Sequence, residues 1–172
     1  MTRADLVVTP KGVRFMGRLF PARLGRGGIT AAKREGDGAT PVGVHRFIGL
    51  LYRPERVARA DLPGWARPIG LRQLWCDDPD HADYNLPVTA PFPASHERLR
   101  RVDPQYDLVL LTDWNWPEAR PGRGSAIFVH IRRGPGHPTA GCVALRRDHL
   151  IWIARRIRPH SRLVVPGVLA RK

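Results

Sequence analysis

The sequence predicts a mainly β protein with a single helix near its C-terminus. Its apolar segments are short, and they are separated by glycine and proline, of which the 172 residues contain 17 each. Both residues favour turns, so this composition favours many short strands over long helices. Apolar side chains recur at helical spacing in one segment, at Leu150, Ile153, Ala154 and Ile157. With 42% hydrophobic residues the chain can bury a core, and its length predicts one domain over residues 1–172.

The N-terminal part of the chain predicts a hairpin, a loop and a long strand. Leu6–Thr9 and Val13–Met16 are apolar runs on either side of a Pro-Lys-Gly turn, which indicates a β-hairpin. Residues 25–41 are rich in glycine and charge and are typical of a loop. Val42–Tyr52 has the β-branched and aromatic residues of a strand.

The rest of the chain predicts further strands around one long loop. Leu71–Trp75 is a short apolar segment, whereas residues 76–96 are rich in proline and aspartate and lack periodicity. A loop of this length in a compact domain is usually functional or disordered. The remaining predicted strands are Tyr106–Thr112, Ser125–Arg132, Cys142–Leu145 and Leu163–Val165.

The predicted helix lies between the last two of these strands and carries its own boundary signals. Asp148 is near its start, where a negative charge interacts favourably with the helix dipole. Pro159 follows the last periodic residue and ends the helix. Together these elements predict a β-sandwich or mixed sheet with one C-terminal helix.

The net charge favours a polyanionic partner without identifying it. The formal charge is +14, the pI is about 11.4, and nearly all of the excess is arginine. Such a field attracts nucleic acid, anionic lipid or an acidic cell wall, and an arginine-rich composition also arises from coding bias alone. The two cysteines, Cys76 and Cys142, are too few for a disulfide framework. No apolar run is long enough to span a membrane, and the N-terminus shows no clear signal peptide.

One segment carries chemistry. His130 lies within an apolar strand pattern, and Cys142 follows Gly141 at the start of the next predicted strand, 12 residues later. If the two strands are neighbours, the imidazole and the thiol meet across the sheet, and a nearby histidine stabilises a thiolate. Gly141 leaves room for a substrate backbone beside the thiol. The alternative is a buried core cysteine and a strand histidine with structural partners only.

Several motifs in order resemble the YkuD-type L,D-transpeptidases, which cross-link peptidoglycan. Together they run from about Gly25 to Val165, and motifs in the right order are more specific than any one of them. The matching segments are Thr139-Ala140-Gly141-Cys142-Val143 after a strand with His130, Thr40-Pro41-Val42-Gly43, Trp75 to Pro79 with Tyr84-Asn85, and Ser95-His96-Glu97. The last two resemble a short, stand-alone branch of that family.

The resemblance implies a fold and a set of catalytic roles. The fold would be the L,D-transpeptidase type, with Cys142 as nucleophile and His130 as its base. The backbone carbonyl of Ile131 would orient the imidazole, and the amides of Gly141 and Cys142 would form the oxyanion hole. Two positions differ from the family pattern: Thr139-Ala140 replaces Ser-His, and Ala144 stands where many relatives carry Arg or Asn.

The same resemblance suggests substrate-binding residues, namely Arg34, His96, Tyr84, Asn85 and Thr139. His96 would face the catalytic cleft, with Glu97 beside it, or else Ser95 would cap a helix that begins there. Arg34 would pair with a stem-peptide carboxylate, or remain a solvated loop charge. The acidic residues between Asp77 and Asp83 lack the spacing of a calcium loop, so we expect no metal site.

The resemblance therefore implies a peptidoglycan L,D-transpeptidase that joins a donor and an acceptor stem peptide through a cysteine thioester. No metal or organic cofactor, nucleic acid or membrane span is implied, and the expected location is the periplasm or cell wall. Links between two third-position residues are commonest in the family, and a first-to-third link is also open. The alternatives are a hydrolase on the same substrates and a basic nucleic-acid-binding module. The oligomeric state is left open.

Overall fold

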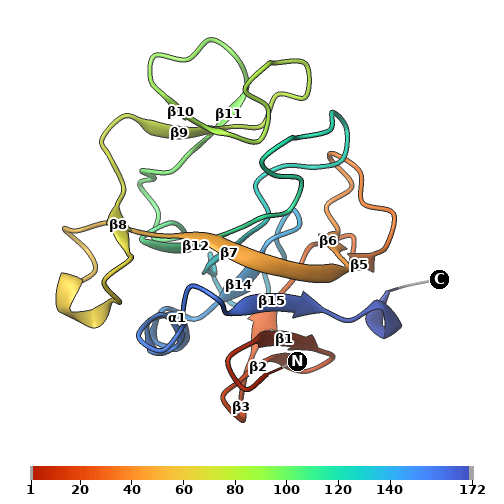
Figure 1. Ribbon diagram of the computed structural model, residues 1–172, viewed down its shortest axis with the longest axis vertical. Helices are drawn as coiled ribbons and strands as arrows, with labels where there is room; N and C mark the ends of the chain where they lie inside the picture. Colours follow the sequence, from red (N-terminus) through yellow and green to blue (C-terminus); the bar gives the residue numbers. More distant parts are fainter. Residues whose placement is uncertain (1, 171–172) are drawn as a thin grey trace.

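The computed structural model describes residues 2–170 and confirms the mainly β architecture with one α-helix (Figure 1). Within these residues the strands form a ten-stranded mixed sheet, a three-stranded sheet and a two-stranded sheet. The strands are β1 (Leu6–Thr9), β2 (Gly12–Phe15), β3 (Arg18–Phe20), β4 (Ala22–Arg23), β5 (Ile29–Thr30), β6 (Thr40–Pro41), β7 (Gly43–Tyr52), β8 (Arg67–Pro68), β9 (Gln73–Cys76), β10 (Pro87–Thr89), β11 (His96–Arg98), β12 (Leu108–Thr112), β13 (Phe128–Ile131), β14 (Val143–Leu145) and β15 (Arg162–Val165). The α-helix is α1 (Arg147–Ala154), and two short 3₁₀ turns are η1 (Arg59–Asp61) and η2 (Gly167–Leu169).

The large sheet is organised around β7. Its strand order is β3-β2-β1-β15-β7-β12-β13-β14-β4, and β8 pairs with β7 outside this path. The first half of β7 pairs with β15, and the second half pairs with β12 across a register shift at Leu111 and Thr112. This irregularity bends the sheet at the point where one long strand passes from one partner to the other.

The two ends of the large sheet are tied together by the chain itself. β3 lies at one end of the strand order and β4 at the other, and Pro21 alone separates them in sequence. The sheet must therefore curl until its ends approach each other. A curled sheet encloses one core, which α1 covers with Leu150, Ile153 and Ala154 (Figure 1).

Strands β12 and β13 are buried on both faces because a second layer covers the outside of the curled sheet. Leu108 and Leu110 of β12 point into the core that α1 covers, whereas Val109 and Leu111 point the other way. The layer on that second face is the β10-β9-β11 sheet, which contributes Trp75 to a separate apolar cluster. A cleft lies between these two layers.

Most of the predicted elements are confirmed, including the N-terminal hairpin, the long strand and the helix. The predicted loop over residues 76–96 is wrong in part, because β10 lies within it and β11 begins at its end. β10 starts at Pro87, and proline is tolerated at the first position of a strand although it weakens the strand signal. Likewise the loop predicted over 25–41 contains β5 and β6, each only two residues long. None of the helices in residues 2–170 is long and apolar enough to cross a membrane.

A buried ion pair fastens the N-terminal segment to β15. Asp5 is 2% exposed and accepts two hydrogen bonds from Arg162, from Nε at 3.0 Å and from Nη2 at 2.8 Å. The Asp5 carboxylate also accepts the Thr2 amide at 2.6 Å. Hydrogen bonds from Arg162 hold the pKa of Asp5 at about 2, against an ordinary value of 3.8.

We expect Asp5→Asn to lower the free energy of unfolding by about 2 kcal/mol at pH 7, because hydrogen bonds to charged groups are strong. Since the folded-state pKa is depressed, this stabilisation is complete above pH 4 and is lost as the pH falls towards 2. Urea unfolding at several pH values measures it. Asp148→Asn is the matched control, because Asp148 is 59% exposed and its pair with Arg146 contributes little. An equal loss in both variants would contradict the assignment.

Candidate active site

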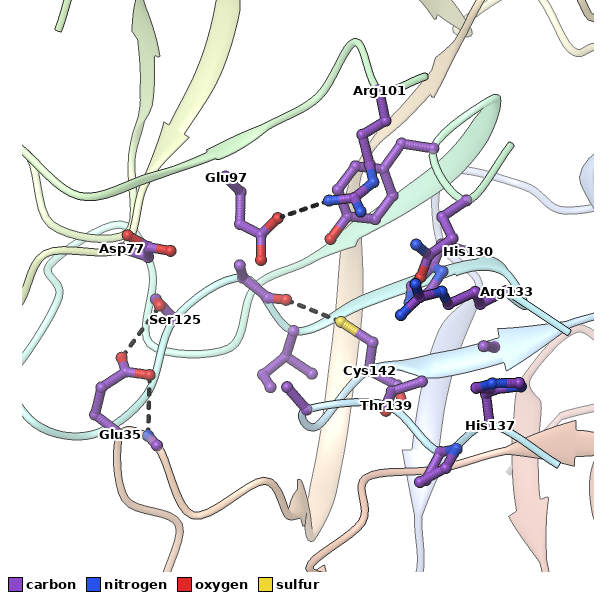
Figure 2. A pocket seen from close by; sticks show the side chains of 18 of the residues that line it. Glu35, Asp77, Glu97, Arg101, Ser125, His130, Arg133, His137, Thr139 and Cys142 are labelled. Carbon is purple, nitrogen blue, oxygen red and sulfur yellow. Dashed lines mark hydrogen bonds and ion pairs between the residues drawn. The ribbon is translucent and has the colours of Figure 1, made fainter. Parts of the chain in front are cut away.

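A cleft of about 440 Å³ lies between the large sheet and the β10-β9-β11 layer. Its lining includes Cys142 and His130, with residues from the loop that precedes Cys142 (Figure 2). The opposite wall comes from the segment around β11 and carries Glu97 and Arg101. The cleft therefore holds the thiol and the imidazole that the sequence singled out.

The pairing of β13 with β14 brings these two side chains to one face. The strands are parallel, with His130 opposite Ala144 and Val129 opposite Val143. Side chains alternate between faces along a strand, so Cys142, two residues before Ala144, points to the same face as His130. Val129 and Ile131 point into the enclosed core instead. The predicted neighbourhood of the two strands is confirmed.

The Cys142 thiol is enclosed by backbone groups in the resting structure. Its Sγ–H donates to the Ala126 carbonyl at 3.1 Å, and its sulfur accepts the Phe128 amide at 3.3 Å. Burial raises the pKa of Cys142 to about 12, although the Phe128 amide opposes this shift. At neutral pH the resting group is therefore a thiol.

The His130 imidazole is buried and neutral. Its Nδ1 bonds to the Ile131 carbonyl at 2.8 Å, which places the ring proton on Nδ1 and leaves the Nε2 lone pair unprotonated. Burial lowers the pKa of His130 to about 4, because the charged ring is poorly solvated there. The Tyr106 ring packs edge-on against the imidazole with centroids 5.3 Å apart, and this contact fixes the plane of the ring.

The loop that presents Cys142 is held by two threonines. Gly141 has φ +142, and a Cβ there would lie 2.9 Å from the Ala39 carbonyl oxygen, so only glycine fits. The Thr40 hydroxyl donates to the Gly141 carbonyl at 2.8 Å and accepts the Gly25 amide at 3.0 Å. The Thr139 hydroxyl donates to the Cys142 carbonyl at 2.6 Å and accepts the Gly141 amide at 3.2 Å. Thr40 belongs to the Thr-Pro-x-Gly motif, whose function here is to hold the Gly141 carbonyl.

Asn85 organises the backbone on the other side of the thiol. It is 1% exposed, and its Oδ1 accepts the Trp75 indole N–H at 3.0 Å and the Ala126 amide at 2.9 Å. Its Nδ2 donates to the carbonyls of Trp114 and Asn115. All four bonding positions of the side-chain amide are thus occupied within the protein. The consequence is a fixed position for Ala126, whose carbonyl accepts the Cys142 thiol.

The structure brings some of the sequence-predicted residues to the cleft and leaves others outside it. Cys142, His130 and Thr139 line the cleft, and Gly141 and the Ile131 carbonyl lie directly behind them. Tyr84 and Asn85 are buried behind the cleft wall, where the Tyr84 hydroxyl donates to Glu35. Arg34 is exposed and its neighbours Lys33 and Glu35, rather than Arg34 itself, line the cleft.

His96 does not face the thiol, contrary to the expectation. It lines a different hollow with Phe92, and the alternation of β11 turns Glu97 towards Cys142 in its place. The other interpretation, in which Ser95 caps a helix, is wrong because His96 begins a strand that pairs with β9. This strand is only three residues long, which is too short for the alternation of its side chains to be recognised in the sequence.

The sequence analysis missed several charged residues in the cleft lining. Their shared feature is that each comes from a loop or from the residue just outside a strand. They are Lys33, Glu35, Asp77, Arg101, Arg133 and His137 (Figure 2). Within the part of the chain that the structure describes, no three acidic, histidine or cysteine side chains are arranged to hold a metal ion.

Comparison with known proteins gives one result. A family model described as YkuD, L,D-transpeptidase catalytic domain, matches residues 5–165. Searches of curated proteins and of solved structures gave no match. The matched range includes every residue of the cleft.

Removing the Thr40 hydroxyl should loosen the loop that carries the thiol. In Thr40→Val the Gly141 carbonyl and the Gly25 amide lose their buried partner, so we expect the free energy of unfolding to fall by about 2 kcal/mol or more. Cys142 should also react faster with an alkylating agent, because the loop opens more often. Thr40→Ser keeps the hydroxyl and should retain a slow alkylation rate. Identical alkylation rates in the valine and serine variants would refute the bridging role.

Proposed function

Because the chain belongs to the L,D-transpeptidase catalytic-domain family, we propose that it cross-links peptidoglycan stem peptides through a thioester on Cys142. The observation that carries this proposal is the position of Cys142 beside His130, on one face of two adjacent strands at the floor of the cleft. A nucleophile with a positioned base is the minimum machinery for covalent acyl transfer. We expect the protein to act in the periplasm or the cell wall, where peptidoglycan is found.

Acylation begins from a neutral pair. As the donor carbonyl approaches Sγ, the Cys142 proton leaves the Ala126 carbonyl and moves to Nε2 of His130. The C–S bond forms while negative charge develops on the carbonyl oxygen. The Ile131 carbonyl stabilises the imidazolium through Nδ1–H, in the position where a cysteine protease uses Asn or Asp. His130 then gives its proton to the departing amine, the C–N bond breaks, and a D-amino acid leaves.

The oxyanion is assigned to the amides of Gly141 and Cys142. The Gly141 amide now makes a long hydrogen bond of 3.2 Å to Thr139 Oγ1, which a charged oxygen would replace favourably. The Thr40 bond to the Gly141 carbonyl fixes the peptide plane that carries the Cys142 amide. Preorganised donors of this kind supply a large share of the stabilisation in acyl transfer.

The second step decides the product. An amine of a second stem peptide attacks the thioester and gives a cross-link, at a third-position or a first-position donor residue. Water in place of the amine gives a hydrolase on the same substrate. No nucleotide enters, because the cleaved peptide bond supplies the energy of the new one.

Incubation of the wild-type protein with a disaccharide-tetrapeptide should give an acyl-enzyme and cross-linked dimers, both measured by mass spectrometry. Cys142→Ala should form neither. Cys76→Ala is the matched control, since Cys76 is the second cysteine of the sequence and lies outside the cleft, and it should behave as wild type. Adduct formation by the Cys142→Ala variant would exclude the thioester. The dimer's fragmentation pattern identifies the donor position.

The rate of acylation should report the low pKa of His130. Only the neutral ring accepts the thiol proton, so kcat/KM for acylation should rise with pH around 4 and be nearly flat from pH 6 to 8. An ordinary histidine would give a half-maximum near 6.5. His130→Ala should lower the rate by roughly 10²-fold or more and remove the acid limb. A half-maximum at pH 6.5 in the wild type would argue against a buried neutral base.

A further inference from the structure

Glu97 faces Cys142 from the opposite wall of the cleft (Figure 2). In the β9–β11 ladder Glu97 pairs with Trp75 and His96 pairs with Cys76. Asp77 and Ser95 continue that ladder, where the Asp77 amide bonds to the Ser95 carbonyl at 3.2 Å. Because strand faces alternate, Asp77 and Glu97 share the face that borders the cleft.

The negative charge of Glu97 is only weakly compensated. Its nearest cation is Arg101, with Nη1 3.7 Å from Glu97 Oε2, which is beyond hydrogen-bonding distance. Arg101 is already engaged by Asp103, through Nε at 3.0 Å and Nη2 at 2.8 Å. Because Asp103 already neutralises the Arg101 guanidinium, the Glu97 carboxylate remains largely free to attract another cation.

Asp77 offers a second oxygen without a partner. Its Oδ1 is buried and makes no hydrogen bond to any residue between 2 and 170. A buried carboxylate oxygen without a donor is costly, and no cation among residues 2–170 forms an ion pair with Asp77, so its charge adds to the negative potential of this wall. Lys33 of the same cleft does not pair with Asp77, because its Nζ bonds to Asp37 at 2.6 Å and to the Arg34 carbonyl at 2.7 Å.

The second step of the proposed reaction needs a place for one extra proton. An acceptor amine arrives in water as an ammonium and ends as an amide, so its nitrogen loses two protons. The thiolate regains one of them through His130. Since Nδ1 of His130 is committed to the Ile131 carbonyl, the imidazole can carry one proton between substrate and sulfur, and the other needs a different base.

We propose that Glu97 is this base: it binds the ammonium of the acceptor and takes its first proton. This inference rests on the proposed function. The ammonium donates to the Glu97 carboxylate, and the negative charge of Asp77 on the same wall adds to its attraction. Glu97 takes a proton and leaves a neutral amine, whose lone pair attacks the thioester carbonyl. The nitrogen gives its second proton to His130, the C–S bond breaks, and Sγ takes that proton; Glu97 returns its own to solvent.

The environment of Glu97 suits this role. Burial raises its pKa above the ordinary 4.5, while Arg101 opposes the shift and Asp77 adds to it. Burial and the charge of Asp77 both make the Glu97 carboxylate more basic, and so closer in basicity to an amine, which makes proton transfer between them easier. Glu97 also disfavours the Cys142 thiolate by its charge. Removing that charge should therefore leave acylation unchanged or faster, opposite in sign to the effect on the acceptor step.

The test separates the two half-reactions in Glu97→Gln, with the exposed Glu118→Gln as the matched control. Acylation is followed by intact mass with a tetrapeptide donor. Transfer is then measured to three nucleophiles: an acceptor stem peptide, water, and hydroxylamine, which is uncharged at neutral pH. We expect Glu97→Gln to slow transfer to the stem amine by about 10²-fold, as the loss of a positioned base does. Acylation, hydrolysis and transfer to hydroxylamine should stay within a few-fold of wild type.

Each other outcome overturns the inference. An unchanged ratio of cross-link to hydrolysis shows that Glu97 is not the base, and an equal fall for the stem amine and hydroxylamine shows a structural effect. Should the glutamine variant fail to fold, Glu97→Asp keeps the charge but withdraws the carboxylate by one carbon, and a loss confined to the stem amine is then expected. Absence of any acyl-enzyme in the wild type is a different failure, that of the proposed function itself.

Discussion

The parallel pairing of β13 and β14 is the constraint on which the site depends. Two parallel neighbours cannot be joined by a tight turn, so the chain must leave the sheet after Ile131 and cross back to the opposite end of β13 before Val143 begins β14. This crossing segment forms the cleft wall that contains His137 and Thr139. It is anchored where Thr139 exchanges backbone hydrogen bonds with Leu24 and Arg26. Cys142 is thus carried into β14 by a loop that is held at its base by backbone hydrogen bonds.

Burial of the Cys142–His130 pair sets its electrostatics. Desolvation disfavours the thiolate and the imidazolium alike, so the two groups rest as neutral partners instead of an ion pair. The hydrogen-bond partners of the pair are backbone groups rather than charged side chains. The Ala126 carbonyl accepts a hydrogen bond from the thiol, and the Ile131 carbonyl accepts one from Nδ1–H of the imidazole. We expect the imidazolium to form only when negative charge develops on a substrate bound beside it. Such a pair avoids the reactivity of an exposed thiolate with oxidants.

The sequence was most informative where a period or a motif was complete. The apolar run with Val129 and Ile131 on either side of His130 predicted a strand, and the Gly-Cys pair pointed to the thiol that lines the cleft. It was least informative in residues 76–96, where a three-stranded layer is built from strands too short to show alternation. Glu97 was therefore noted without its direction, and His96 was given the wrong one. The charged loop residues of the cleft had no sequence signal, because only long-range pairing decides which loops meet.

The Thr40 hydroxyl links segments that lie 101 residues apart in the chain, and this distance has a consequence for how the protein can change. The turn that carries Cys142 does not hold its shape by itself, because it depends on contacts with Gly25, Ala39 and Thr40. If the Gly-Cys loop alone were transplanted into another protein, it would lose the contacts that hold its conformation. A substitution near Thr40 therefore changes the support of the Gly141 turn, and a substitution in that turn changes what Thr40 must hold.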